Sequence, residues 1–205
     1  AGGPTGDPAA PALLLASAPI LACFAYFSLL AVSLAGLQTF LPTTLPKLHP
    51  VDVATAGFML TGYMVANGAG NLAGGLVAGR TDRHEAIVAF GLAGAALVLL
   101  AVAHVPMEAA VLAGAIGLVG FLSGMTTPAR DMLVRAAAPR GATGKVFGFV
   151  YSGLDLGSCI APLVLGLLLD GGRPAAAMTL IAASLGATIL SALLVRKATP
   201  RLQAA

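Results

Sequence analysis

Long apolar runs alternate with short charged or proline-containing segments along almost the whole chain. Each run has about 20 residues, enough to cross the roughly 30 Å hydrocarbon layer of a bilayer at about 1.5 Å per helical residue. The pattern therefore predicts an all-α polytopic membrane protein with six transmembrane helices. We expect these helices at residues 19–41, 55–78, 86–105, 109–130, 146–169 and 175–195.

The composition favours a bilayer over water as the solvent. Of the 205 residues, 58% are hydrophobic and only 9% are charged, whereas a soluble domain carries roughly 25% charged residues. The net charge of +3 comes from basic residues that lie between the apolar runs and form no continuous patch, which argues against nucleic-acid binding. Cys23 and Cys159 fall inside apolar runs without metal-ligand spacing, so we expect no metal site and no other cofactor.

The same pattern divides the chain into three parts. Residues 1–11 are rich in Gly, Pro and Ala and are expected to form a flexible linker, residues 12–197 the six-helix bundle, and residues 198–205 a cytoplasmic tail. Because the sequence starts with Ala rather than Met, we expect a fragment or a processed product.

The distribution of Lys and Arg predicts the orientation in the membrane. Short loops that carry more of these residues stay on the cytoplasmic side. With both termini inside, nine Lys and Arg residues lie inside and two outside, so we expect both termini to be cytoplasmic. The inside set is Arg80, Arg83, Arg130, Arg135, Arg140, Lys145, Arg196, Lys197 and Arg201, and the outside set is Lys47 and Arg173.

Glycines at four-residue spacing indicate where helices approach closely. Four such pairs occur: Gly70 with Gly74, Gly120 with Gly124, Gly144 with Gly148, and Gly153 with Gly157. The third and sixth spans contain no ionisable or amide side chains within their apolar runs, so we expect them to face lipid.

Polar side chains gather on the other spans and predict a shared interior. Tyr63, Asn67 and Asn71 stand four residues apart in the second span, and Tyr151 and Asp155 do so in the fifth. Gln38 of the first span either joins this interior or bonds a neighbouring backbone group. These residues are the candidates for substrate or proton binding.

Asp155 supports the sharpest functional hypothesis. It lies about 12 residues into its helix, or about 18 Å deep, which is close to the bilayer midplane. An ionised carboxylate in hydrocarbon is costly, so the group must face water, meet a cation or stay protonated. These environments suit proton coupling or cation recognition. The alternative is a structural hydrogen bond to the amide of Asn67 or Asn71.

Charged and imidazole side chains at the span ends are less specific. We expect His49, His84 and His104 to be solvated at the interface. Asp131 and Arg135 have the spacing of a helical ion pair, so the cluster that they form with Arg130 is either anchoring charge or part of a gate.

The segment from Gly75 to His84, Gly-Leu-Val-Ala-Gly-Arg-Thr-Asp-Arg-His, resembles the cytoplasmic loop signature of the major facilitator superfamily. The whole chain is similar to the C-terminal six-helix half of that family, which is a 3+3 inverted repeat. The Pro-Ala-Arg-Asp sequence at residues 128–131 and the segment 144–157 are similar to drug-efflux members, especially the fosmidomycin-resistance type. The chain departs from the signature at Gly79, where the family has an acid, and at Asp82, where it has a glycine.

The resemblance implies a secondary active transporter for small organic molecules, with proton-coupled efflux, in a bacterial inner membrane. It implies that the first and fourth spans line a cavity, the second and fifth flank it, and the third and sixth face lipid. It also implies that a second six-helix half is needed, either an N-terminal half or a second copy. The residues implied in cytoplasmic gating are Gly75, Arg80, Asp82, Arg83, Arg130 and Asp131.

Two other functions remain open on the sequence. One is a non-catalytic membrane scaffold or an inactive half-transporter, because a fold does not dictate a function. The other is an intramembrane protease, but Ser152-Gly153 lacks the leading glycine pattern of such serine enzymes and Asp155 has no second membrane aspartate beside it. We therefore expect no enzyme.

Overall fold

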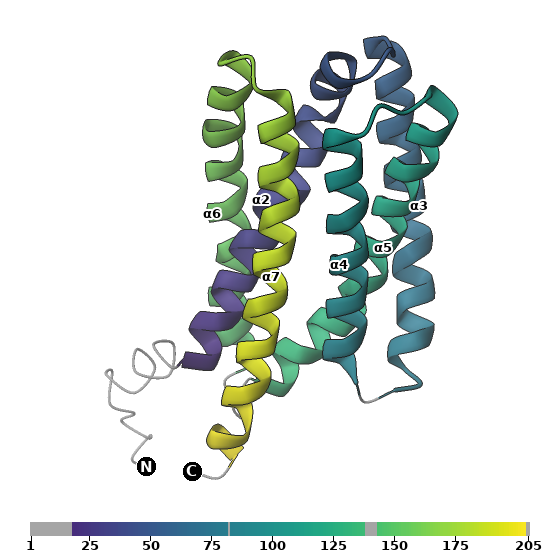
Figure 1. Ribbon diagram of the computed structural model, residues 1–205. Coiled ribbons are helices and arrows are strands. Elements are labelled where there is room, and N and C mark those ends of the chain that lie inside the picture. The colour runs from purple at the N-terminus through teal and green to yellow at the C-terminus, as the bar shows by residue number, and fades with distance from the viewer. Residues whose placement is uncertain (1–17, 82, 138–142, 204–205) are drawn as a thin grey trace, which may run out of the picture.

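The computed structural model describes residues 18–81, 83–137 and 143–203. In these ranges the chain is helical, as predicted, with six helices joined by short connections (Figure 1). They are α2 (Ala18–Leu48), α3 (Val53–Ala78), α4 (His84–His104), α5 (Ala109–Ala137), α6 (Thr143–Asp170) and α7 (Pro174–Gln203).

The helices run up and down, so α2 begins and α7 ends at the same end of the bundle (Figure 1). This end also receives the last turn of α5 and the first turn of α6, which carry Arg135 and Lys145, and the α3–α4 connection with Arg80 and Arg83. We call it the basic end.

Five of the described helices are long and apolar enough to cross a membrane, namely all but α3. The glycines of α3, together with Asn67 and Asn71, lower its hydropathy. Yet α3 has 26 residues, a length of about 39 Å, and it runs alongside α5 (Figure 1). The five apolar helices are those of an integral membrane protein, and a sixth crossing by α3 stays a prediction.

Three predicted helix ends are wrong. We expected helices to end at residues 41, 130 and 195, but α2 continues to Leu48, α5 to Ala137 and α7 to Gln203. The extension of α2 passes through Pro42 and Pro46. Proline removes one backbone donor, and membrane helices tolerate this loss when neighbouring groups compensate. Buried Leu45 holds this last part of α2 against the bundle.

Glycine allows α3 and α5 to touch backbone to backbone. A Cβ added to Gly70 or Gly74 would overlap a carbonyl group of α5, and one added to Gly120 or Gly124 would overlap a carbonyl group of α3. The contact is therefore reciprocal along the two helices, and two of the four predicted glycine pairs meet each other.

A second close contact joins α2 and α6. Gly153 and Gly157 of α6 lie against the backbone of Phe24 and Ser28 of α2. The remaining predicted pair, Gly144 and Gly148, faces open space among the described residues. Helices α4 and α7 pack against each other and close the bundle, α4 on α5 and α7 on α2.

His49 differs from the expectation of a solvated histidine at the interface. His49 is only 4% exposed; its Nε2 lies 2.9 Å from the carbonyl oxygen of Val102, and the backbone N–H of Met107 donates to its Nδ1 at 3.4 Å. A carbonyl cannot donate and an amide N–H cannot accept, so the ring must be neutral with its proton on Nε2. His49 thus ties the end of α2 to the α4–α5 connection. His104 is exposed but bonds Thr179 of α7.

We predict that Gly124→Ala destabilises the bundle by about 1–3 kcal/mol, the usual cost of overpacking, because its methyl group meets the carbonyl of Asn67. Thermal unfolding in detergent measures the effect. Gly114→Ala on the same helix, where a Cβ meets nothing within 4 Å, is the matched control and should be neutral or slightly more stable. Equal melting temperatures for the two variants would contradict the close contact.

We also predict that His49→Ala lowers the melting temperature more than His49→Gln does, because Gln retains one donor and one acceptor for the two backbone groups. Nitrogen chemical shifts of the labelled wild-type ring should report a protonated Nε2 and an unprotonated Nδ1. The opposite tautomer would exclude the hydrogen-bond assignment.

Candidate functional site

A charged and aromatic cluster joins three helices near the basic end. It consists of Phe27 on α2, Arg130 and Asp131 on α5, and Tyr151 on α6, and we call it the Arg130 cluster. Arg130 lies seven residues before the end of α5, about 10 Å from the basic end at 1.5 Å per residue. The cluster therefore lies between the basic end and the midplane of the bundle.

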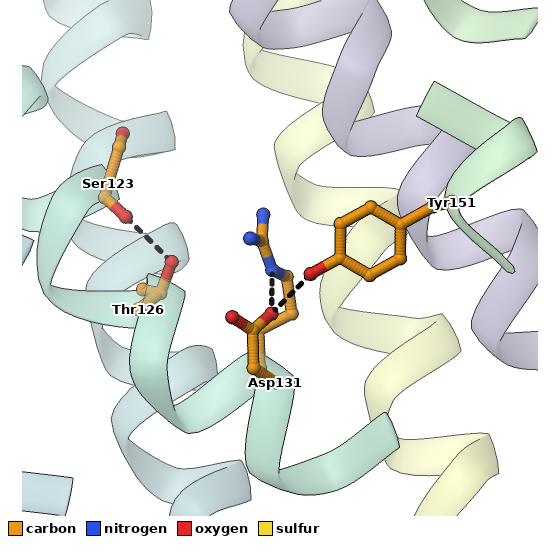
Figure 2. A network of polar contacts seen from close by, with 5 residues as sticks. Ser123, Thr126, Asp131 and Tyr151 are labelled. Atoms are coloured by element: carbon orange, nitrogen blue, oxygen red, sulfur yellow. Dashed lines mark hydrogen bonds and ion pairs between the residues drawn. The ribbon is translucent and has the colours of Figure 1, made fainter. Parts of the chain in front are cut away.

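One carboxylate oxygen organises the polar part of the cluster. Asp131 Oδ1 accepts a hydrogen bond from Arg130 Nε at 3.1 Å and another from the hydroxyl of Tyr151 at 3.2 Å. Figure 2 shows the Tyr151 side chain reaching across from α6 to Asp131. The side chain of Arg130 is 11% exposed and that of Asp131 is 42% exposed. The carboxylate thus opens toward solvent, whereas the guanidinium is almost covered.

The ring of Phe27 lies against the guanidinium, and further aromatic rings pack beside it. The Cζ atom of Arg130 lies 4.9 Å from the ring centre of Phe27, within the range of a cation–π contact. The ring of Tyr151 lies 4.9 Å from that of Phe27 and 5.7 Å from that of Phe147. These contacts hold Arg130 and Tyr151 in defined positions.

The predicted pairing of Asp131 with Arg135 is wrong. Asp131 pairs with the adjacent Arg130, while Arg135 is exposed. Packing on Phe27 orders the Arg130 side chain in advance, whereas an exposed arginine must give up side-chain freedom to form a weakly stabilising surface pair.

The predicted cavity residues divide by exposure. Tyr63 is buried, and its hydroxyl has no hydrogen-bond partner in the described part of the chain. Asn67 is half-buried, and its Nδ2 donates to the carbonyl of Gly120 at 3.2 Å. Asn71 and Gln38 are exposed. In the described part of the chain, buried Tyr63 and exposed Asn71 and Gln38 therefore have different surroundings.

Asp155 is exposed on α6, one helical turn beyond Tyr151. The structure gives it no hydrogen bond to Asn67 or Asn71, because Asn67 bonds α5 instead. The structural alternative considered for Asp155 is therefore not seen between the residues that the structure describes.

The predicted gating residues lie around the end of α3. Gly75 is 4.0 Å, measured from an added Cβ, from the ring of Pro128, so α3 passes close to α5 just before Arg130. Arg80 and Arg83 are exposed in the α3–α4 connection. Asp82 lies outside the described residues, so its part in the gate stays a prediction.

Sequence reasoning missed the aromatic part of the site. Phe27 lies in an apolar run of α2 where nothing distinguishes it from other core residues. The Tyr151–Asp131 bond joins residues 20 positions apart on different helices, so helical periodicity could place each residue on a face but could not pair them.

The described region includes a groove between α3 and α5 and another between α4, α6 and α7, and neither is lined by a predicted site residue. One of about 380 Å³ lies between the first turns of α3 and α5, with Phe58 and Gly62 in its wall. The other, of about 530 Å³, lies between α4, α6 and α7 beside His104 and Thr179. The Arg130 cluster is therefore the candidate site with defined chemistry.

Comparison of the sequence with known protein families gives a match. The sequence model of the Major Facilitator Superfamily matches residues 9–205, which is nearly the whole chain. A search of curated proteins gives no match.

We predict that Tyr151→Phe costs about 1 kcal/mol of unfolding free energy, because it removes one hydrogen bond to a partly exposed carboxylate but keeps the ring contacts. Tyr151→Ala should cost about 3 kcal/mol or more, because it also leaves a void between Phe27 and Phe147. Chemical unfolding in detergent compares them. Equal losses would mean that the ring contacts contribute nothing.

Proposed function

The chain belongs to the major facilitator superfamily of membrane transporters, and from this membership we propose that it is one half of a proton-coupled secondary transporter that exports a small organic molecule. A drug-efflux activity of the fosmidomycin-resistance type is part of the proposal. Both termini are placed in the cytoplasm and the bundle in a bacterial inner membrane, in line with the excess of Lys and Arg at the basic end.

The packing supports a 3+3 inverted repeat. If α2–α4 and α5–α7 are the two repeats, exchanging them maps α2 onto α5, α3 onto α6 and α4 onto α7. The close α2–α6 contact then becomes the close α3–α5 contact, and the α2–α7 contact becomes the α4–α5 contact. Both of the first two contacts are made by glycines. Transporters of this kind place their substrate site between such repeats.

The main support for the proposal is the depth and exposure of Asp155. It is a carboxylate about 18 Å from the start of α6, near the midplane, and it is exposed on a helix whose main contact is with α2 alone. Lipid cannot cover an ionised carboxylate at this depth without a large cost. A water-filled cavity that loads and releases a proton meets the requirement.

The uncovered sides of α3 and α6 support a second six-helix body. Phe58 and Leu72 on α3, and Leu163 and Leu167 on α6, are among the most exposed apolar side chains. Lipid could cover these four, but Asp155 shares α6 with the last two. An N-terminal half or a second copy of the chain would cover the apolar side chains and leave a polar passage.

The remaining candidates receive roles within this scheme. Protons and the transported molecule would meet Asp155 and the side chains that line the passage, which are Tyr63, Asn67, Asn71, Gln38 and Tyr151. The gate at the basic end would use Gly75, Arg80, Asp82, Arg83, Arg130 and Asp131. Gating would bias the inward-open and outward-open states as the two halves rock.

We predict that Asp155→Asn in the complete gene product abolishes proton-driven export, because Asn cannot carry the proton. Inverted membrane vesicles energised by a pH gradient, tested with a panel of drugs, measure export. A loss of about tenfold or more is expected at normal expression, with partial activity in Asp155→Glu.

Cys159→Ser is the matched control, since Cys159 lies one turn further along α6 and is also exposed. It should export normally. Unchanged export in Asp155→Asn would assign Asp155 a structural role. No export by the original protein would favour a scaffold or an inactive half.

A further inference from the structure

We propose that Arg130 is a binding subsite for the anionic group, a carboxylate or a phosphate, of the transported molecule. The inference deepens the proposed function and rests on it, because it names the chemical class of the substrate. It arises from donors of Arg130 that the Arg130 cluster leaves unused.

The guanidinium of Arg130 uses one edge only. Its Nε donates to Asp131 at 3.1 Å, the hydroxyl of Tyr151 lies within hydrogen-bond reach of the guanidinium, and the terminal Nη groups form no ion pair with any residue that the structure describes. A guanidinium presents its donors in a planar fork that matches the two oxygens of a carboxylate or phosphate. The free edge is therefore suited to a two-point contact with an anion.

The position of Arg130 makes this edge effective. The side chain is almost covered, at 11% exposure, and Phe27 lies against its face. Charged hydrogen bonds strengthen where water is excluded. The stacked ring also fixes the guanidinium beforehand, so binding an anion does not require a flexible side chain to become ordered.

Asp131 modulates the subsite without filling it. Its Oδ1 already accepts from both Arg130 and Tyr151, and 42% of its side chain is exposed. Its charge partly offsets that of Arg130 and so weakens anion binding. Removing the charge of Asp131 should therefore strengthen the subsite, whereas a purely structural ion pair would not behave in this way.

The surroundings favour a flat organic anion. Arg80 and Arg83 are exposed at the basic end, where they raise the local concentration of anions. The half-buried ring of Tyr151, whose hydroxyl donates to the same Asp131 oxygen as Arg130, offers apolar surface for the body of the molecule. The subsite lies about 10 Å from the basic end, against about 18 Å for Asp155, so anion binding and proton binding occupy different levels.

The test is equilibrium binding of 4-fluorobenzoate to the full chain in lipid nanodiscs, followed by ¹⁹F NMR, with neutral 4-fluorobenzamide as the matched probe. Benzoate should bind more tightly than benzamide. Arg130→Gln should raise the benzoate Kd by about tenfold or more, and Arg130→Lys, which keeps the charge but not the fork, by several-fold. Arg135→Gln removes the same charge from an exposed site on α5 and should change the Kd less than twofold.

Asp131→Asn should lower the benzoate Kd several-fold, and this variant, together with Arg130→Lys, decides the question if Arg130→Gln does not fold. The proposal is overturned if the benzoate Kd is unchanged in Arg130→Gln or Arg130→Lys, or if Asp131→Asn binds benzoate equally or more weakly. It is also overturned if benzamide binds as tightly as benzoate, or if the original chain does not bind benzoate. Because no gradient is involved, such a failure would leave Asp155-dependent export standing, and a failure of export would leave the binding result standing.

Discussion

Backbone contact at glycine is the interaction on which the rest of this bundle depends. Lipid tails are as apolar as leucine side chains, so helices in a bilayer gain little from burying apolar surface and associate through close packing instead. Gly70, Gly74, Gly120 and Gly124 let α3 and α5 touch, and Gly157 does the same for α6 on α2. These two pairs are the rigid units, and α4 and α7 join them.

Such pairing determines where polar chemistry can lie. Since α3 is held by α5 and α6 by α2, each of the two keeps a side that no other described helix covers. The α5–α3 contact fixes Asn67 on the carbonyl of Gly120, and the α2–α6 contact brings Tyr151 and Phe27 together near Arg130. The close packing therefore places the Arg130 cluster at the junction of the two rigid pairs.

Apolar run length predicted the helices well, because crossing a bilayer demands about 20 apolar residues whatever the packing. It failed at Pro42 and Pro46, where the helix continues because tertiary contacts outweigh the local preference of proline. Glycine spacing predicted the α3–α5 contact but could not tell it from Gly144 and Gly148, where an added Cβ would meet no described atom within 4 Å. Periodicity gives a face, whereas identifying the partner requires the fold.

The Arg130 cluster was less predictable, because periodicity does not identify which helices meet. Its charged members stood out in the sequence, yet the burial of Arg130 under Phe27 and the hydrogen bond from Tyr151 to Asp131 depend on three helices meeting. His49 illustrates the same limit, since its two hydrogen bonds reach backbone groups more than 50 residues away.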